Sequence, residues 1–221
     1  MNRLSYILLI ISQLTFSQVT KNLAEFNKIT SFDKIDVTLI QATENKIILN
    51  GLGSENVETE ITNNELKIKM PLTKLLSGDN VSATVYFKKI EAIEANEGSR
   101  IAYDKQIDAT IFSIIIKEGS EINVKLNCNK LILKASAGSK IDLEGKTTTQ
   151  DILLNSGAVL RAKNFKSNQT TVTANTGAEA QVYASDFVDA KVRAGGSIYI
   201  YGKPKQINQK KIAGGKIEQA Q

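Results

Sequence analysis

The sequence predicts an all-β protein: a right-handed parallel β-helix (β-solenoid) with coils of about 19 residues, capped or flanked by an N-terminal β-region. Three observations predict this fold. Glycines recur at a near-constant spacing, apolar residues alternate on both sides of each glycine, and charges alternate between repeats at fixed positions. The recurring glycines are Gly98, Gly119, Gly138, Gly157, Gly177, Gly195 and Gly214. Their successive spacings are 21, 19, 19, 20, 18 and 19 residues, so we expect each repeat to be one coil.

The chain begins with a segment that is typical of an export signal. Residues 1–17 read MNRLSYILLIISQLTFS, in which Arg3 precedes an apolar run and the small residues Thr15 and Ser17 precede an expected cleavage point. An amphipathic or core segment is the alternative. The run is shorter than the ~20 residues that a membrane-spanning helix needs, and no later stretch is longer. We therefore expect a signal peptide, no membrane span, and an exported product in the periplasm, at the cell surface or outside the cell.

Residues 18–92 are expected to form the N-terminal β-region, in which the repeat loses its strict register. Alternating apolar residues from Phe32 to Leu39 predict strands. The stretch from Val57 to Met70 reads as a β-hairpin around Asn63-Asn64. Residues 81–87 alternate and predict an irregular first coil.

The β-solenoid repeats are expected over residues 93–221, continuous with the N-terminal β-region because no flexible linker divides them. If each glycine is numbered zero, offsets −5, −3, +3 and +5 are apolar in the first six repeats, which predicts strands with one buried face. These positions are Ile93, Ala95, Ile101, Tyr103, Ile114, Ile116, Ile122, Val124, Leu133, Ala135, Ile141, Leu143, Ile152, Leu154, Leu160, Ala162, Val172, Ala174, Ala180, Val182, Ala190, Val192, Ile198 and Ile200. Around Gly214 the first two become Gln209 and Lys211, which suits a polar last coil.

The residues at offsets that point outward indicate whether the coils stack on one another. Residues at equal offset in stacked coils are neighbours ~4.8 Å apart, where opposite charges are favourable. Offset +2 reads Arg100, Glu121, Lys140, Val159 and Glu179, and offset +6 reads Asp104, Lys125, Glu144, Lys163, Tyr183 and Tyr201. The charges alternate in sign along both columns. An antiparallel β-sandwich, the main alternative, has no reason to keep this pattern.

Composition excludes several classes of chemistry. The 221 residues contain no His and one Cys, which leaves no intrachain disulfide and no cysteine-based zinc site, and removes the commonest general base. Cys128, at the offset of Ile107, is expected to be a buried structural residue. The net charge of +5 is interspersed, so we expect no nucleic-acid partner. Carboxylates such as Asp142 and Glu144 have basic neighbours in their columns, so we predict no catalytic, cofactor-binding or metal-binding residues.

Three surface features remain as candidates. We assign Asn96, Lys117, Lys134, Asn155, Asn175 and Arg193 to one polar stripe. We assign Ile115, Ile132 and Leu153 to an exposed apolar ladder that needs cover, from the N-terminal region, which we favour, or from a partner. Tyr183, Tyr199 and Tyr201 are expected to project outward, where they stack on sugar rings or simply fill the strands. The candidate ligand-binding residues are Lys117, Lys134, Arg193, Tyr199 and Tyr201.

The order of motifs resembles one known family. The glycine-centred units EGS, AGS, SGA, TGA and AGG, the FDKIDV stretch and the closing YIYGKP are similar to the Putative auto-transporter adhesin, head GIN domain family, over Ile29 to Gln219. The resemblance implies an exported β-helical protein with an adhesin role and no established catalytic residues.

We therefore expect an exported, non-catalytic adhesin or cell-envelope binding protein that needs no cofactor and binds glycan or a cell-surface protein. Two alternatives stay open: a β-helix carbohydrate-active enzyme, such as a polysaccharide lyase or hydrolase, and a purely structural envelope component. The sequence leaves the oligomeric state open.

Overall fold

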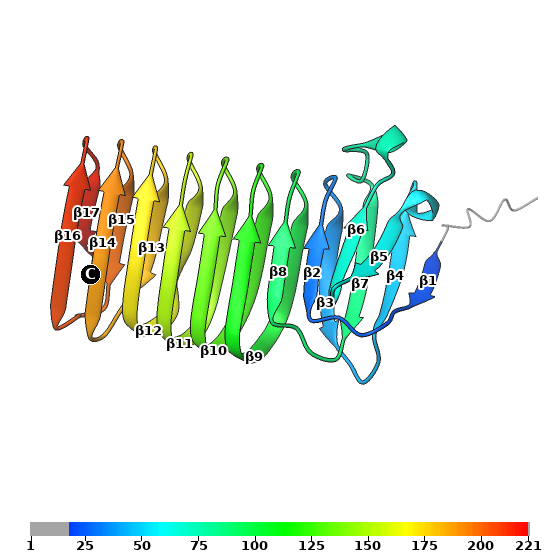
Figure 1. Cartoon of the computed structure of the whole chain (residues 1–221), viewed down its shortest axis with the longest axis horizontal. Helices are drawn as coiled ribbons and strands as arrows, with labels where there is room; N and C mark the ends of the chain where they lie inside the picture. Colours follow the sequence, from blue (N-terminus) through cyan, green and yellow to red (C-terminus); the bar gives the residue numbers. More distant parts are fainter. Residues whose placement is uncertain (1–17, 221) are drawn as a thin grey trace, which may run out of the picture.

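A computed structural model describes residues 18–220 and confirms the β-solenoid. The described chain is 66% strand and 3% helix, and it winds through about 7 turns that are about 19 residues apart (Figure 1). The predicted signal peptide, residues 1–17, lies outside the described residues. None of the helices found in residues 18–220 has the length and apolar character that crossing a membrane requires.

Each regular coil is one long strand that bends once. The four long strands are β9 (Arg100–Ile116), β10 (Glu121–Ala135), β11 (Lys140–Leu154) and β12 (Val159–Asn175). The later coils are β13 (Glu179–Tyr183) with β14 (Phe187–Arg193), β15 (Ser197–Tyr201) with β16 (Gln206–Ile212), and finally β17 (Lys216–Gln219). All these strands pair in parallel with their equivalents in the next coil.

The bends divide every coil between two sheets. We call the sheet made by residues that follow each recurring glycine face A, and the sheet made by residues that precede it face B. In Figure 1 the strands of face B lie in front, and the glycine turns form the upper edge. The bend in the middle of each coil forms the opposite edge, at the bottom of the view.

The glycine edge is built from two-residue turns that need positive φ at both positions. Glu118 has φ 57° and Gly119 has φ 70°, the left-handed conformation that suits a type I′ turn. A Cβ added to Gly119 would meet nothing within 4 Å. The backbone conformation, and not lack of space, therefore demands glycine here. The turns also join the coils, because the Gly119 N–H donates to the Ala137 carbonyl at 2.9 Å.

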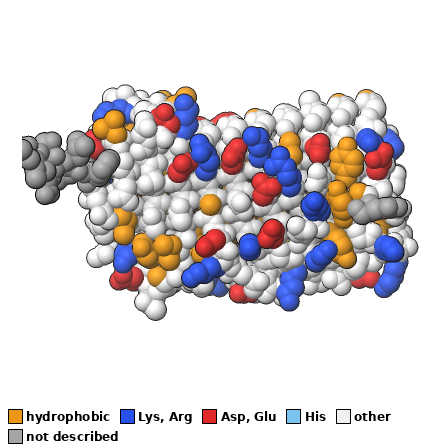
Figure 2. Space-filling model, turned by 180° about the vertical axis from the view of Figure 1, so that it is seen from behind, with side chains coloured by type: hydrophobic (Ala, Val, Ile, Leu, Met, Phe, Trp, Pro, Cys, Tyr) orange, Lys and Arg blue, Asp and Glu red, His pale blue; other side chains and the backbone are white. Residues whose placement is uncertain are grey.

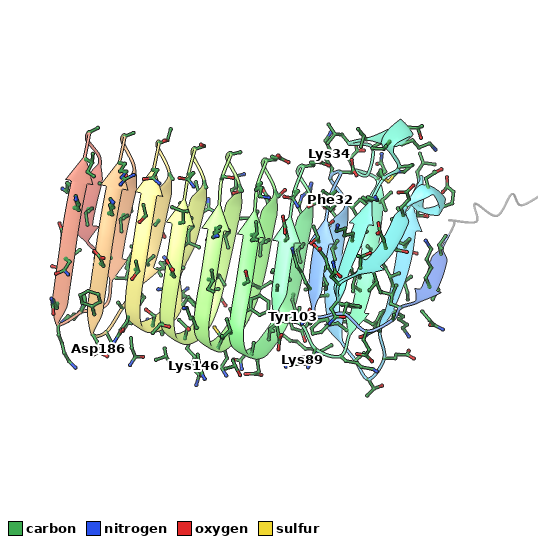
Figure 3. All side chains as sticks on the ribbon, in the orientation of Figure 1. Phe32, Lys34, Lys89, Tyr103, Lys146 and Asp186 are labelled. Atoms are coloured by element: carbon green, nitrogen blue, oxygen red, sulfur yellow. The ribbon has the colours of Figure 1, made fainter. Side chains whose placement is uncertain are left out.

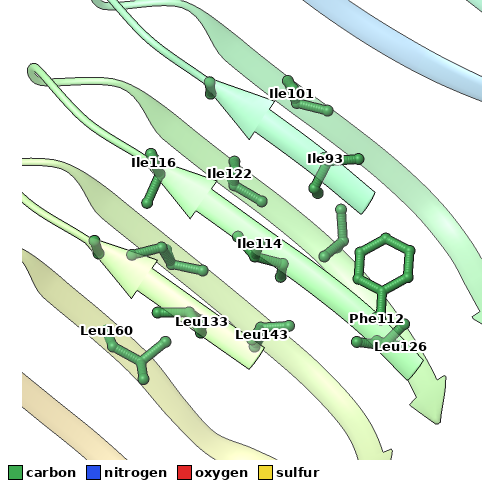
Figure 4. Packing of buried hydrophobic residues seen from close by; sticks show 14 of the residues in the cluster. Ile93, Ile101, Phe112, Ile114, Ile116, Ile122, Leu126, Leu133, Leu143 and Leu160 are labelled. Carbon is green, nitrogen blue, oxygen red and sulfur yellow. The ribbon is translucent and has the colours of Figure 1, made fainter. Parts of the chain in front are cut away.

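The interior between the two faces is filled by stacked apolar side chains. All of the 24 residues at the four inward offsets are buried, as predicted. Ile93, Ile114 and Leu133 pair in successive strands and form one such stack (Figure 4). In the last coil Gln209 and Lys211 take the places of Ala190 and Val192 and are exposed, which confirms the polar last coil.

The charge columns are confirmed in part and corrected in part. The offset +2 column is continuous, and Lys140 Nζ lies 3.1 Å from Glu121 Oε1. In the offset +6 column Lys125 pairs with Glu144, but on its other side it pairs with Gln106, and Glu144 pairs with Asn164. The predicted places of Asp104 and Lys163 in that column are therefore wrong.

The cause is the unequal length of the coils. The first coil has 21 residues and the fourth has 20, and the register shifts between Val124 and Lys125 and between Asp142 and Glu144 absorb the extra residues as bulges. The shift between Val124 and Lys125 also changes the residue that pairs with Cys128. Cys128 pairs with Ala109 and not with Ile107, as the equal offset had predicted.

The N-terminal region continues the stack but in a different chain order. β2 (Lys28–Ser31) pairs in parallel with both β6 (Glu65–Lys69) and β8 (Ala92–Ala95). β3 (Asp36–Gln41) pairs in parallel with both β7 (Val81–Phe87) and β9. The first coil of the chain is therefore inserted between two coils that come later in the sequence.

Antiparallel strands end the stack beyond β6 and β7. β4 (Lys46–Gly51) pairs with β7, β5 (Glu58–Thr62) pairs with β6, and β1 (Val19–Asn22) pairs with β4. The predicted hairpin is confirmed as β5 and β6, joined by Asn63 and Asn64 with φ 52° and 62°. Two short 3₁₀ turns, η1 (Ser54–Asn56) and η2 (Leu72–Lys74), lie in the loops of this end.

Candidate functional site

The predicted surface residues fall on opposite faces of the solenoid. Lys117, Lys134 and Arg193 come from the halves of the coils that form face B, whereas Tyr199 and Tyr201 lie in β15 on face A. The structure thus brings the two tyrosines together and separates them from the three basic residues. No single ligand-binding site contains all five.

On face B the predicted stripe and ladder are wrong in register. Lys134 pairs with Ile115 on one side and with Leu153 on the other, so it belongs to the ladder and not to the stripe. Ile132 pairs with Ser113 and Asp151. Ile132 and Lys134 point to the same side because side chains alternate with a period of two, but they stand at different places along the strand. A lysine therefore interrupts the apolar ladder.

The predicted cover of this ladder by the N-terminal region is also wrong. β2 and β3 stack on the end of the solenoid, beside β8 and β9. Ile115 and Leu153 are half-buried without that cover. Lys117 is held by an ion pair, with its Nζ 3.3 Å from Glu94 Oε1.

Face A carries an aromatic cluster at its C-terminal end. Tyr183 pairs with Tyr201 in the adjacent strand, and Tyr199 lies two residues before Tyr201 on the same side. All three are half-buried, with part of each side chain exposed. We call Tyr183, Tyr199 and Tyr201 the tyrosine platform. Figure 2 shows this face, with hydrophobic side chains gathered toward the C-terminal end and charges of both signs over the middle.

Two lysines lie against the platform. Lys166 Nζ is 3.9 Å from the centre of the Tyr183 ring, and Lys216 Nζ is 5.3 Å from that of Tyr199. Both distances fall within the range of cation–π attraction. A hydrogen bond to Glu218 raises the pKa of Lys216 above its usual value, so this lysine is charged at neutral pH. Lys216 is paired with Glu218 at 2.8 Å, whereas Lys166 forms no ion pair in residues 18–220, so the positive charge at the platform lies on the Tyr183 side.

A polar groove of about 680 Å³ follows the opposite edge and meets the platform at Tyr183. Lys146 lies on this edge, at the bottom of Figure 3. The groove is lined by Asn127, Cys128, Asn129, Lys146, Thr147, Thr148, Lys166, Ser167, Asn168, Tyr183 and Ser185. None of these lining residues is acidic. Tyr183 belongs to both features, so the groove and the platform form one continuous surface.

Buried polar side chains beneath the groove hold Tyr183 in place. The Tyr183 carbonyl accepts hydrogen bonds from Ser167 Oγ at 2.6 Å, Thr170 Oγ1 at 3.1 Å and Gln150 Nε2 at 3.2 Å. Three donors on one carbonyl fix the backbone that carries the ring. These three residues were not among those predicted from the sequence. Their signal is the appearance of Gln150, Ser167 and Thr170, together with Thr147, at buried positions of strands whose interior is mostly apolar.

Cys128 is buried, as predicted, and lies at the edge of the same network. Its thiol donates to Thr147 Oγ1 at 3.4 Å, and burial raises the pKa of the thiol. A buried thiol with a raised pKa is a poor nucleophile, which fits a structural role.

Two acidic residues of face A that were candidates for catalysis are engaged with basic neighbours. Glu144 Oε2 lies 3.4 Å from Lys125 Nζ, as predicted, and Asp142 Oδ2 lies 3.4 Å from Arg161. Within residues 18–220, His, Cys, Asp and Glu form no group of three that would hold a metal ion. The surface of platform and groove therefore offers aromatic stacking, hydrogen-bond donors and positive charge.

Comparison with known proteins places the chain in a family. Residues 25–204 match the model of the family described as Putative auto-transporter adhesin, head GIN domain. The chain belongs to this family. No curated protein matches its sequence.

Several solved structures share the fold. A putative adhesin from Bacteroides fragilis NCTC 9343 has a TM-score of 0.87 at 18% identity, covering 94% of this chain and 98% of that one. A putative adhesin from Parabacteroides merdae ATCC 43184 has a TM-score of 0.76 at 16% identity, covering 93% and 96%. A putative lipid binding protein from Parabacteroides distasonis ATCC 8503 has a TM-score of 0.74 at 14% identity, covering 92% and 96%. At these identities the likeness concerns the fold alone.

Proposed function

We propose that this member of the adhesin family is an exported, non-catalytic protein that binds carbohydrate at the cell envelope. The single observation that carries the proposal is the tyrosine platform, in which Tyr183 and Tyr201 are paired in register and Tyr199 extends the same surface. The family membership and the export signal predicted for residues 1–17 support a role outside the cytoplasm.

The chemistry of the platform suits sugar rings. The apolar C–H faces of a pyranose pack on the faces of aromatic rings, and tyrosine adds a hydroxyl that hydrogen-bonds to sugar hydroxyls. The rings stand on a parallel sheet whose strands lie ~4.8 Å apart. Because the Tyr183 backbone is fixed by three buried donors, little conformational freedom is lost when a ligand binds.

The state of the nearby acids favours binding over catalysis. A glycosidase needs two carboxyl groups at a set separation across one sugar. Near the platform, Glu218 pairs with Lys216 at 2.8 Å and Asp186 pairs with Lys205 at 2.7 Å. Carboxylates that are neutralised in this way are poorly placed to act as an acid and base pair.

The proposal predicts that the platform tyrosines carry binding. In the mature chain, Tyr199→Ala combined with Tyr201→Ala should weaken polysaccharide binding by about tenfold or more, because each change removes an aromatic stacking surface. Glycan microarrays and affinity gel electrophoresis measure the effect on a panel of neutral and acidic polysaccharides. The matched control combines Lys134→Ala with Arg193→Ala on face B and should bind as the parent does.

Three results would overturn the proposal. If the tyrosine variant binds polysaccharide as tightly as the parent, the platform is not part of the binding site. Depolymerisation of a bound polysaccharide, lost on changing a pair of carboxylates, would instead establish the enzyme. Self-association in sedimentation experiments, with no polysaccharide bound, would establish a structural envelope component.

A further inference from the structure

We propose that the groove on the opposite edge binds the negatively charged groups, carboxylate or sulfate, of an acidic polysaccharide whose adjoining sugars lie on the tyrosine platform. This inference rests on the proposed function and names its ligand class. The structure places two lysines together at this edge. Lys146 in β11 pairs with Lys166 in β12, and both side chains are exposed.

The charge pattern at this place differs from the rest of face A. Elsewhere, neighbouring coils place opposite charges together, as in Lys140 with Glu121 and Lys125 with Glu144. Like charges that lie directly opposite each other destabilise a sheet. In residues 18–220 neither the Lys146 nor the Lys166 ammonium forms an ion pair. A negative charge from a ligand would supply the missing partner.

Two acids that contact groove-lining residues, Asp108 and Asp186, already have hydrogen-bond or ion-pair partners. Asp108 Oδ1 accepts hydrogen bonds from Asn127 Nδ2 at 2.6 Å and from Gln106 Nε2 at 3.0 Å. Asp186 Oδ1 lies 2.7 Å from Lys205 Nζ, and its Oδ2 accepts from Asn168 at 3.3 Å. The groove between them is lined by neutral donors and by the two lysines. The only charged side chains in this lining are therefore the two lysines, which favours anions.

Lys166 connects the anion site to the sugar site. Its ammonium stands 3.9 Å from the centre of the Tyr183 ring, at the border of groove and platform. Because Lys166 covers one face of the Tyr183 ring, a sugar packed on the neighbouring Tyr201 would bring an acidic substituent toward Lys166, and the next acidic group along the polymer would lie toward Lys146. Hydrogen bonds between an ammonium and a carboxylate or sulfate are stronger than neutral ones. The lysine pair therefore selects an acidic polymer over a neutral one.

The experiment compares charged and uncharged forms of the same polymer on the mature protein. The probes are polygalacturonate against its methyl ester, and dextran sulfate against dextran, in calorimetry and affinity electrophoresis at 0.15 M salt. The parent should prefer each charged form. Lys146→Gln with Lys166→Gln should reduce that preference, measured as the ratio of the affinities for the charged and the uncharged form, about tenfold or more. Lys146→Arg with Lys166→Arg should restore the preference.

A matched control removes the same charge elsewhere. Lys134→Gln with Lys210→Gln lowers the net charge by two on face B, and should change the preference less than twofold. Free galacturonate tests for a small-anion site, and is expected to bind far more weakly than the polymer. Equal losses in the two double variants, or equal binding of monomer and polymer, would overturn the inference.

The outcomes also separate this inference from the proposed function. If the tyrosine variant loses binding and the lysine variant keeps the preference for acidic forms, the inference about the lysine pair is wrong and the proposed function stands. If the lysine variant loses that preference and the tyrosine variant binds as the parent does, the proposal that the tyrosine platform binds sugar is wrong. If the parent binds none of the four polymers but binds a neutral polysaccharide of the wider panel through the tyrosines, only the inference about acidic polymers is wrong.

Discussion

Lys34 occupies a backbone position that costs free energy. It stands in the turn between β2 and β3 with φ 63°, where the equivalent turns of the following coils have glycine, as in Gly98 with φ 74°. The left-handed conformation costs a non-glycine residue about 1–2 kcal/mol. The turn is held nevertheless, because Asp33 beside it is buried and accepts hydrogen bonds from the Met70 and Leu76 amides at 2.9 and 2.8 Å.

Replacing Lys34 with glycine should therefore stabilise the protein. Relief of the left-handed strain exceeds the extra entropy that glycine gives the unfolded chain, so we expect Lys34→Gly to raise the free energy of unfolding by about 0.5–1 kcal/mol. Urea denaturation measures the change. Gly138→Lys is the reverse control, because a Cβ there meets nothing within 4 Å, and it should lower the free energy of unfolding by about 1 kcal/mol. A loss of stability in Lys34→Gly would contradict this account.

At the scale of elements, the junction between β6, β2 and β8 is joined by side-chain charges. Lys28 Nζ lies 2.9 Å from Glu65 and 2.7 Å from Glu94, which also pairs with Lys117 at 3.3 Å. These three strands are neighbours although the sequence separates them widely. The ion pairs therefore join segments that backbone hydrogen bonds alone would match less specifically.

This junction predicts a dependence of stability on pH. Burial acts to raise the pKa of Glu94, but the hydrogen bond and charge of Lys28, with bonds from Asn96 and Lys117, outweigh it and lower the pKa below its usual value. The unfolded carboxylate then takes up a proton at a higher pH than the folded one. The contribution of Glu94 is present above the usual pKa of glutamate and is lost as pH falls through the lowered value.

Glu94→Gln should make the free energy of unfolding depend less on pH at acid pH. Chemical denaturation at pH 7 and at steps between pH 5 and pH 3 measures the free energy of unfolding, and the variant should lose less stability over that range than the parent. Glu179→Gln is the control, since Glu179 lies in β13, away from the junction, and makes no ion pair in residues 18–220. Parallel pH curves for Glu94→Gln and the parent would show that the cluster contributes nothing to folding.

At the scale of the molecule, a stack of coils has stability that varies along its axis. Each coil contacts mainly its neighbours, so an end coil is held from one side. In the final coil, β16 pairs with β14, and Gln209 and Lys211 stand where other coils bury apolar side chains. This coil therefore gains less from burial than β10 or β11, which have a parallel neighbour on each side.

Amide hydrogen exchange should reveal this gradient. We expect amides of β16 to exchange at least about 100-fold faster than those of β10 and β11, because local opening of the last coil costs less free energy than global unfolding. Exchange followed by mass spectrometry on the mature protein measures the rates. Equal protection along the whole axis would mean that the stack opens only as one unit.

Much of the regular solenoid could be predicted because its signals are local. Alternation at Ile93, Ile114 and Leu133 reports which side of a strand is buried, and the glycine spacing reports the length of a coil. The outward direction of Tyr199 and Tyr201 follows from the same alternation. These properties depend on neighbours within a few residues along the chain.

Only the tertiary structure decided the order in which the strands stack and which side chains of different coils become neighbours. β2 and β3 fit between β6, β7 and β8, β9 because any strand with the right alternation offers the same backbone hydrogen bonds, so local pattern leaves the order of stacking open. Bulges in the longer coils moved Asp104 and Lys163 out of their columns. The junction of Tyr183 with Lys166 and Lys146, on which the candidate site depends, likewise arises only when separate coils come into register.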